Sequence, residues 1–446
     1  MTQQSLTQEA RYLSAFESFE KNGATRDPSW ARALRQAAIA RFRELGFPVA
    51  RRGNEEWKYT DVGPIARAPL LPLMAAAPAR VTARRLARYT FGRQAADWNL
   101  LVFVDGRYVE QLSSLPSLPT GASVTDLADA LANGTGLAEQ HLARYADYNK
   151  SAFTALNTAF LHDGALVHIP DGVQVDAPIH LLFLYTSRAQ DAASHPRVLV
   201  IAGKESKTTI IESHGGLEDN QYFANAVTEV ALGERAAVRY YKVQRQSEQS
   251  FHIATTQVEL GRDSTFLSCN LDLGGGLVRN NLNMVLAGEG SSCMLGGLYM
   301  VSRNQHVDNQ VIVDHAASYT TTRELYKGIL DGKSRSVFHG SIIVRKGLHK
   351  VNAEQVDKNL LLSDRAEADT KPAFWIYSDD VKCGHGAACG QLDERALFYL
   401  RSRGLSEEEA RGFLVRGFVA EVVNAIDYAP FRGHAEELVA ARLQAM

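Results

Sequence analysis

Glycine turns recur at a nearly constant interval through the middle of the chain. Five of them end short runs of β-branched and apolar residues, at Gly172, Gly203, Gly233, Gly261 and Gly288, and the intervals between them are 31, 30, 28 and 27 residues. A period of this length, built from short strands, is typical of a solenoid or a propeller. No long helical pattern separates the runs, which excludes a βαβ parallel sheet, and the uneven spacing without a Trp-Asp signature disfavours a propeller. The pattern therefore predicts a mainly β protein with a β-helix core, whose stacked coils bury one continuous interior.

Helical patterns lie on both sides of this core. Helices are predicted from Pro28 to Gly46, over 393–403, after a capping box at 406–409, and over 434–444. We predict three parts: an N-terminal helical and irregular domain (1–150), a β-helix core (151–380) and a C-terminal helical domain (381–446). The C-terminal helices are expected to cap the end of the strand stack, because a solenoid must cover its open interior.

The charge and the apolar pattern exclude two classes of partner. The formal net charge is −2 over 446 residues, whereas a general nucleic-acid or membrane-surface binder carries a basic excess. The first residues lack the basic and apolar regions of a secretory signal, and no apolar run approaches the roughly 18–20 residues of a membrane span. We therefore expect a cytoplasmic protein that binds neither nucleic acid nor membrane.

Motifs of the common enzyme classes are missing from the sequence. The segment 332–334 ends like a phosphate-binding loop, but Lys327 stands where the first glycine is required. There is no Gly-x-Ser-x-Gly elbow, no His-Glu-x-x-His and no Cys-x-x-Cys. The adjacent Asp379 and Asp380 would face opposite sides of a strand, so they do not form an acid/base pair. We expect a protein that is not an enzyme.

The chain has four cysteines, too few for a disulfide framework in 446 residues. Cys269 and Cys293 lie within strand-like runs and are predicted to be packing residues, since free cysteine behaves as a small hydrophobe. The other two lie in a different setting.

The segment 379–391 collects metal-ligand chemistry. Cys383, His385 and Cys389 lie within seven residues, among glycines that let a backbone turn sharply. Thiolate and imidazole bind iron–sulfur units and zinc, and Lys382 is expected to lower the pKa of the Cys383 thiol if its ammonium lies near the sulfur. A closed site needs four protein ligands and this segment offers three, so the site is either completed by a partner or labile. The alternative is a plain glycine turn between the last strand and a helix.

At these residues the sequence resembles the SufB/SufD family of the SUF iron–sulfur cluster assembly scaffold. The resembling segments are Asp369–Pro372, Ile376–Gly386, Gly390–Asp393 and Leu397–Gly404, with Glu55–Asp61 near the N-terminus. Lys-Cys-Gly-His-Gly at 382–386 resembles the D-type pattern; B-type subunits resemble Glu-His-Glu-Ala-Thr there and carry a scaffold cysteine somewhat upstream. No cysteine occurs between Cys293 and Cys383, which also matches the D type. The resemblance spans nearly the whole chain.

The resemblance implies a fold, partners and site residues. It implies a right-handed parallel β-helix, a complex with a SufB-like subunit, and two copies of a SufC-like ABC ATPase that dock on the helices at roughly 390–430. His385 would lie at the interface with the SufB-like subunit and help to form a transient iron–sulfur cluster shared with it, and Cys383 is the weaker candidate ligand. Cys389 departs from the family pattern. We expect flavin only in the assembled complex, and a homodimer of the isolated chain through an exposed edge strand.

Two other functions remain open from the residues alone. A β-helix also suits a carbohydrate-active enzyme, although such enzymes usually act outside the cell. Cys383, His385 and Cys389 would also suit a zinc-binding structural protein, in which tight stoichiometric zinc is the expected observation.

Overall fold

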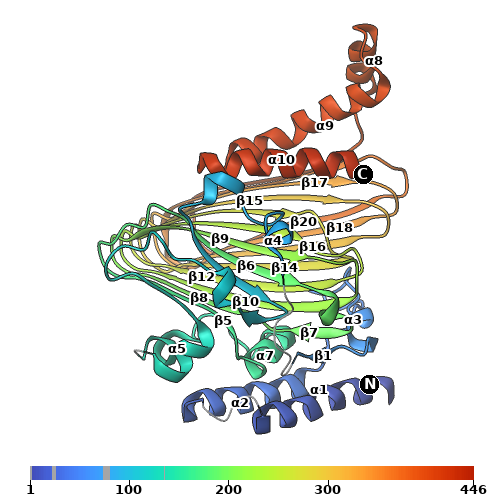
Figure 1. The fold of residues 1–446 in the computed structure, drawn as a ribbon. Coiled ribbons are helices and arrows are strands. Elements are labelled where there is room, and N and C mark those ends of the chain that lie inside the picture. The colour runs from blue at the N-terminus through green and yellow to red at the C-terminus, as the bar shows by residue number, and fades with distance from the viewer. Residues whose placement is uncertain (1–2, 23–26, 74–80, 135) are drawn as a thin grey trace.

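The computed structural model describes all residues except 1–2, 23–26, 74–80 and 135. Its core is a β-helix in which the chain alternates between two sheets, so that each strand pairs in parallel with the strand two places on. We call the sheet that ends in β20 sheet A and the sheet that ends in β21 sheet B. The predicted mainly β fold with a β-helix core and flanking helices is confirmed (Figure 1).

Most strands of the regular coils are eight to thirteen residues long, and β8 has six. Sheet A contains β8 (Arg197–Ala202), β10 (Tyr222–Leu232), β12 (Phe251–Leu260), β14 (Leu277–Leu286), β16 (His306–His315), β18 (Arg335–Val344) and β20 (Glu367–Ile376). Sheet B contains β9 (Lys207–Gly216), β11 (Ala237–Arg245), β13 (Thr265–Asp272), β15 (Ser292–Val301), β17 (Thr321–Leu330), β19 (His349–Leu361) and β21 (Asp380–Gly390).

The glycine period arises because the turns of successive coils touch. A Cβ atom added to Gly233, Gly261 or Gly288 would lie 2.9, 3.0 or 2.3 Å from the carbonyl carbon of the preceding glycine in the column. Real Cβ atoms do not approach backbone so closely, so only glycine fits at these positions. The glycines are therefore required by close backbone approach between coils.

Side chains inside the coils form the lumen of the β-helix, and those outside are covered in part by helices. The lumen is mostly apolar, with stacked residues such as Val238, Phe266 and Cys293. The register keeps these residues in one column, because in-register parallel strands stack side chains of the same face.

The terminal helices lie on opposite outer faces (Figure 1). Near the N-terminus, α1 (Gln3–Asn22), α2 (Ser29–Leu45) and α7 (Ala152–Ala159) pack through aromatic residues against the outer face of sheet A. At the other end, α9 (Glu407–Asn424) and α10 (Ala429–Ala445) pack on the outer face of sheet B, against residues such as Leu298 and Ile329. The short helices are α3 (Gly63–Arg67), α4 (Ala83–Leu86), α5 (Leu127–Asn133), α6 (Leu137–His141) and α8 (Glu394–Ser402), with 3₁₀ turns at Gly92–Ala95, Glu110–Leu112 and Ser187–Ala189.

Two features differ from the sequence expectations. The C-terminal helices cover a face of the β-helix and not its end, because their buried stripe, including Val415 and Val419, meets apolar residues on the outside of sheet B. The N-terminal region also contributes strands that its pattern did not predict. β2 (Asn99–Val104) pairs with β6 (Ile179–Tyr185), and β4 (Ser123–Asp126) pairs with β5 (Gly164–Ile169).

The remaining short strands complete the N-terminal side of the sheets. β3 (Arg107–Tyr108) pairs with β2, and β1 (Leu71–Pro72) pairs with β7 (Ala192–Ser194). Two helix ends were predicted correctly: Gly46 stops α2, and the capping box of Ser406 and Glu409 opens α9. The last helix begins at Ala429, five residues before the predicted start. Among the described residues, no helix is long and apolar enough to cross a membrane.

Candidate functional site

The candidate ligands lie on the last strand of the solenoid. β21 pairs with β19 on one side and, in the part of the chain that the structure describes, has no strand on its other side; β20 likewise ends sheet A. The final coil therefore leaves the lumen open, and we call this opening the mouth. Interior side chains can be reached from outside the molecule at the mouth.

Strand alternation places Cys383 and His385 on the lumen side of β21, which is the strand at the mouth. Cys383 lies beside Ala353 in register and packs against the apolar lumen, so it continues the column that contains Cys293. His385 lies beside Gln355 in register, and its ring is 4.3 Å from the ring of Phe374, centroid to centroid. Because Phe374 comes from β20, this contact joins the ends of the two sheets across the lumen.

Cys389 lies too far along the strand to share one ion with Cys383. The two thiols are six residues apart in an extended strand, which corresponds to about 20 Å at about 3.3 Å per residue. In keeping with this, no group of three or more His, Cys, Asp or Glu side chains among the described residues could hold a metal ion. A single zinc ion bound by Cys383, His385 and Cys389 is therefore excluded. The segment is also a strand and not the predicted sharp turn.

The predicted activation of the Cys383 thiol is wrong. Partial burial raises its pKa, in spite of a hydrogen bond with the backbone of Ala353. Lys382 is the preceding residue of the same strand, so its side chain points to the opposite face and does not stabilise the thiolate. Burial, with the nearby Asp357, also raises the pKa of Cys389. Both thiols are thus protonated at neutral pH.

The other two cysteines are packing residues, as predicted. Cys269 and Cys293 are buried, and burial raises the pKa of each thiol to about 12. Cys293 faces the lumen, whereas Cys269 lies on the outer face of sheet B beneath the C-terminal helices.

The lumen beneath the mouth is polar, which the sequence analysis did not predict. Gln355 Nε2 donates to Glu324 Oε2 at 2.7 Å, and the Tyr299 hydroxyl lies within hydrogen-bond distance of two acceptors, Asn359 Oδ1 at 2.6 Å and Asp357 Oδ1 at 3.1 Å. Burial raises the pKa of Glu324 to about 8 and that of Asp357 to about 6. These carboxyl groups are enclosed within the coils that support the mouth.

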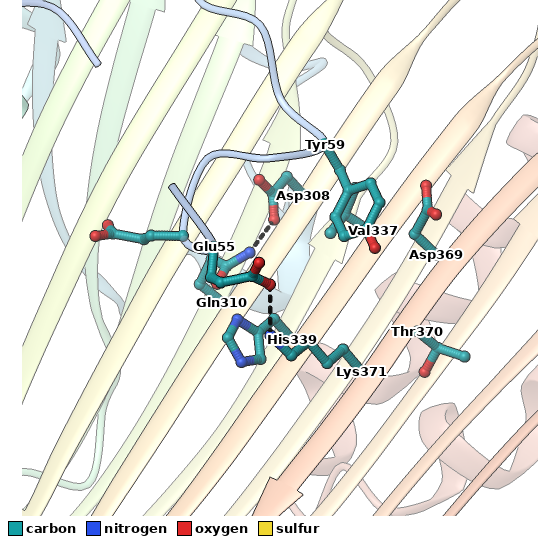
Figure 2. Close-up of a pocket in the computed structure, with 10 residues that line it drawn as sticks. Glu55, Tyr59, Asp308, Gln310, Val337, His339, Asp369, Thr370 and Lys371 are labelled. Carbon is teal, nitrogen blue, oxygen red and sulfur yellow. Dashed lines mark hydrogen bonds and ion pairs between the residues drawn. The ribbon is translucent and has the colours of Figure 1, made fainter. Parts of the chain in front are cut away.

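A separate cavity of about 150 Å³ lies on the outer face of sheet A (Figure 2). Glu55 from the N-terminal segment forms an ion pair with Lys371 of β20 at 3.0 Å, and Gln310 donates to Asp308 of β16 at 2.6 Å. The segments 55–61 and 369–372 are therefore close together despite their separation in the chain.

A buried arginine beside this cavity fastens the N-terminal segment. Arg279 is wholly buried, contacts Asp308 at 2.6 Å and donates to the Glu56 carbonyl at 2.9 Å. Its guanidinium carbon lies 3.7 Å from the centre of the Trp57 ring, a cation–π geometry. The ion pair of Glu55 with Lys371 and the contacts of Arg279 give the segments 55–61 and 369–372 a role in packing.

Two sets of exposed apolar side chains offer contact surfaces. Next to the mouth, the end of β20 and the residue after it expose Trp375, Ile376 and Tyr377 by 55%, 36% and 61%. On the projecting α8–α9 hairpin, Phe398, Tyr399 and Phe413 are exposed by 74%, 56% and 56% (Figure 1). Apolar groups gathered in this way mark interaction surfaces more often than isolated ones do.

Comparison with known proteins gives a consistent result over nearly the whole chain. The family model described as SUF system FeS cluster assembly, SufBD core domain, matches residues 184–418, and the SufBD protein N-terminal region matches residues 6–181. An iron–sulfur cluster assembly SufBD family protein of Synechocystis is 33% identical over 92% of this chain and 90% of its own length. SufD of Escherichia coli is 29% identical over 92% and 91%, and SufD of Bacillus subtilis is 27% identical over 97% of each chain.

Proposed function

Because this chain belongs to the SufBD family of iron–sulfur cluster assembly proteins, we propose that it is a D-type scaffold subunit and that nascent clusters form at its mouth. The family is one of assembly proteins, so the chain is not an enzyme and a carbohydrate-active role is excluded. Its setting is the SUF system, together with other Suf subunits.

The observation that supports the proposal is the position of His385 on the terminal strand of sheet B, whose outer edge is unpaired among the described residues. The ring is exposed, fixed against Phe374, and lies within about 7 Å of Cys383 along the strand. A cluster needs more ligands than these two, so a second chain across the mouth must supply the rest. A cluster that is to be handed on suits such a divided ligand set, since separating the subunits opens the site.

We propose a SufB-like subunit as the partner at the mouth and a SufC-like ABC ATPase at the α8–α9 hairpin. The exposed Trp375 and Tyr377 and the unpaired edges of β20 and β21 suit the first contact. Phe398, Tyr399 and Phe413 suit the second. The isolated chain is expected to pair with itself through the same free edges. The complex is expected in the cytoplasm, and flavin only in that complex.

His385→Ala tests the proposal in cells that depend on this system for cluster assembly. We expect the variant to fold and to co-purify with the SufB-like and SufC-like subunits at normal stoichiometry. Maturation of iron–sulfur enzymes should fall by about tenfold or more, since losing even a residue that orients a metal ligand costs 10–100-fold.

The matched control is His349→Ala, which removes an exposed histidine of the neighbouring strand. It should leave maturation unchanged. Normal maturation in the His385→Ala variant would refute the proposed role of the mouth, and failure of the wild-type chain to co-purify with either subunit would refute the proposed complex.

A further inference from the structure

Three consecutive coils place polar side chains at one position of the lumen beneath the mouth. Glu324 of β17 pairs in register with Gln355 of β19, which pairs in register with His385 of β21. Glu324 and Gln355 are 2% and 0% exposed, and His385 is exposed at the open end. The three residues form a column that leads from the enclosed interior to the mouth.

The amide of Gln355 is held in one orientation. Its Nε2 donates to Glu324 Oε2 at 2.7 Å. Across the lumen, Gly340 provides the space that the amide occupies, because a Cβ atom there would lie only 2.0 Å from Gln355 Nε2. In the structure Nε2 thus faces Glu324 and the space beside Gly340, while Oε1 makes no bond to the carboxyl group.

This orientation leaves one strong acceptor unused. Gln355 Oε1 is buried and has no hydrogen-bond partner among the described residues. An unsatisfied buried acceptor costs free energy, because it has lost its hydrogen bonds to water. A donor on the adjacent coil would remove that cost, and the residue beside Gln355 on that coil is His385.

We propose that Gln355 is a positioning residue, whose Oε1 accepts a hydrogen bond from one ring N–H of His385. A neutral imidazole has one N–H and one nitrogen lone pair, so this bond fixes the tautomer and directs the lone pair out of the mouth. Histidines that bind metals commonly donate their other N–H to a carbonyl or carboxylate in this way. The metal-binding part of the inference rests on the proposed function; the hydrogen bond does not.

The test uses Gln355→Met, which keeps the length of the side chain and removes the acceptor. In the metal-free protein with ¹⁵N-labelled histidine, the ring shifts of His385, assigned by their loss in His385→Ala, should show one dominant tautomer. In Gln355→Met they should show a mixture of both tautomers. Cluster maturation in cells should fall by about 10–100-fold.

Gln310→Met is the control, because Gln310 is also a buried glutamine that donates to a carboxylate, but it lies on the outer face of sheet A. It should leave both readouts unchanged. Identical His385 ring shifts in wild type and Gln355→Met would overturn the inference, whatever the maturation assay gives. A tautomer change with normal maturation in both Gln355→Met and His385→Ala would keep the hydrogen bond and reject the proposed function.

Discussion

Glu324 is enclosed in the β-helix lumen, and its replacement by glutamine should have a calculable effect on stability. The residue is 2% exposed, and burial raises its pKa to about 8. Its Oε1 has no partner among the described residues, whereas Oε2 accepts from Gln355 at 2.7 Å. Glutamine has nearly the same shape and keeps an acceptor oxygen for that bond, but it cannot ionise. Glu324→Gln therefore isolates the cost of the buried charge.

The size of the effect follows from the difference in pKa between the folded and unfolded chain. A glutamate in the unfolded chain titrates near 4.5, so the folded-state pKa is higher by about 3.5. Since the unfolded state releases the proton first, the free energy of unfolding falls by about 1.4 kcal/mol per pH unit between pH 4.5 and 8. The loss is absent below pH 4.5 and levels off near 5 kcal/mol above pH 8. The advantage of Glu324→Gln over wild type should thus be about 3–4 kcal/mol larger at pH 8 than at pH 5.

Urea unfolding followed by circular dichroism between pH 5 and pH 9 measures this difference. Glu354→Gln is the control, because Glu354 is exposed on the outer face of sheet B and should give a profile parallel to that of wild type. If the profile of Glu324→Gln also ran parallel to wild type within about 0.5 kcal/mol, the carboxyl group would titrate normally and the reasoning would be refuted.

Two further predictions concern packing. Gly261→Ala should lower the free energy of unfolding by about 1–3 kcal/mol, because the new Cβ would lie 2.8 Å from a backbone oxygen of the preceding coil. The contrasting variant is Gly417→Ala, at an open position in α9, which should raise the free energy of unfolding by up to about 1 kcal/mol in the same urea assay. Arg279→Met should cost about 3–5 kcal/mol because Asp308 stays buried without its cationic partner, and adding Asp308→Asn should recover part of the loss. A cost below about 1 kcal/mol would show that the pair does not hold the N-terminal segment.

Features fixed by local chemistry could be read from the sequence. The glycine period predicted the coils because the steric requirement at Gly233 or Gly261 repeats once per coil. Helix ends at Gly46 and Ser406 were equally local. The position of the C-terminal helices was not predictable, because it depends on the outer face of sheet B. A strand that is buried on both faces has a continuous apolar sequence, so its pattern does not show which face a helix covers.

The candidate site residues could be selected from the sequence, but their surroundings could not. Cys383 and His385 stand out by residue type, whereas the glycines beside them suggested a turn and the structure has a strand. Glu324 and Gln355 carried no usable signal, since a polar residue in a strand normally indicates the solvent side. Their importance depends on the register between coils, which brings residues about 30 positions apart into one column.

The two ends of the β-helix differ in a way that bears on the proposed function. At the N-terminal end, the antiparallel strands β3 and β4 complete the two sheets, whereas β20 and β21 leave the other end open. Among the described residues, the last coil is therefore a place where interior side chains can meet a second chain. There the isolated subunit offers one imidazole and one thiol, and partial burial keeps that thiol protonated. Two ligands fall short of the four that a closed metal site needs. A partner that covers the mouth would add ligands and exclude water, which strengthens every charge interaction at the site. Cluster formation is then coupled to subunit association, as a scaffold requires.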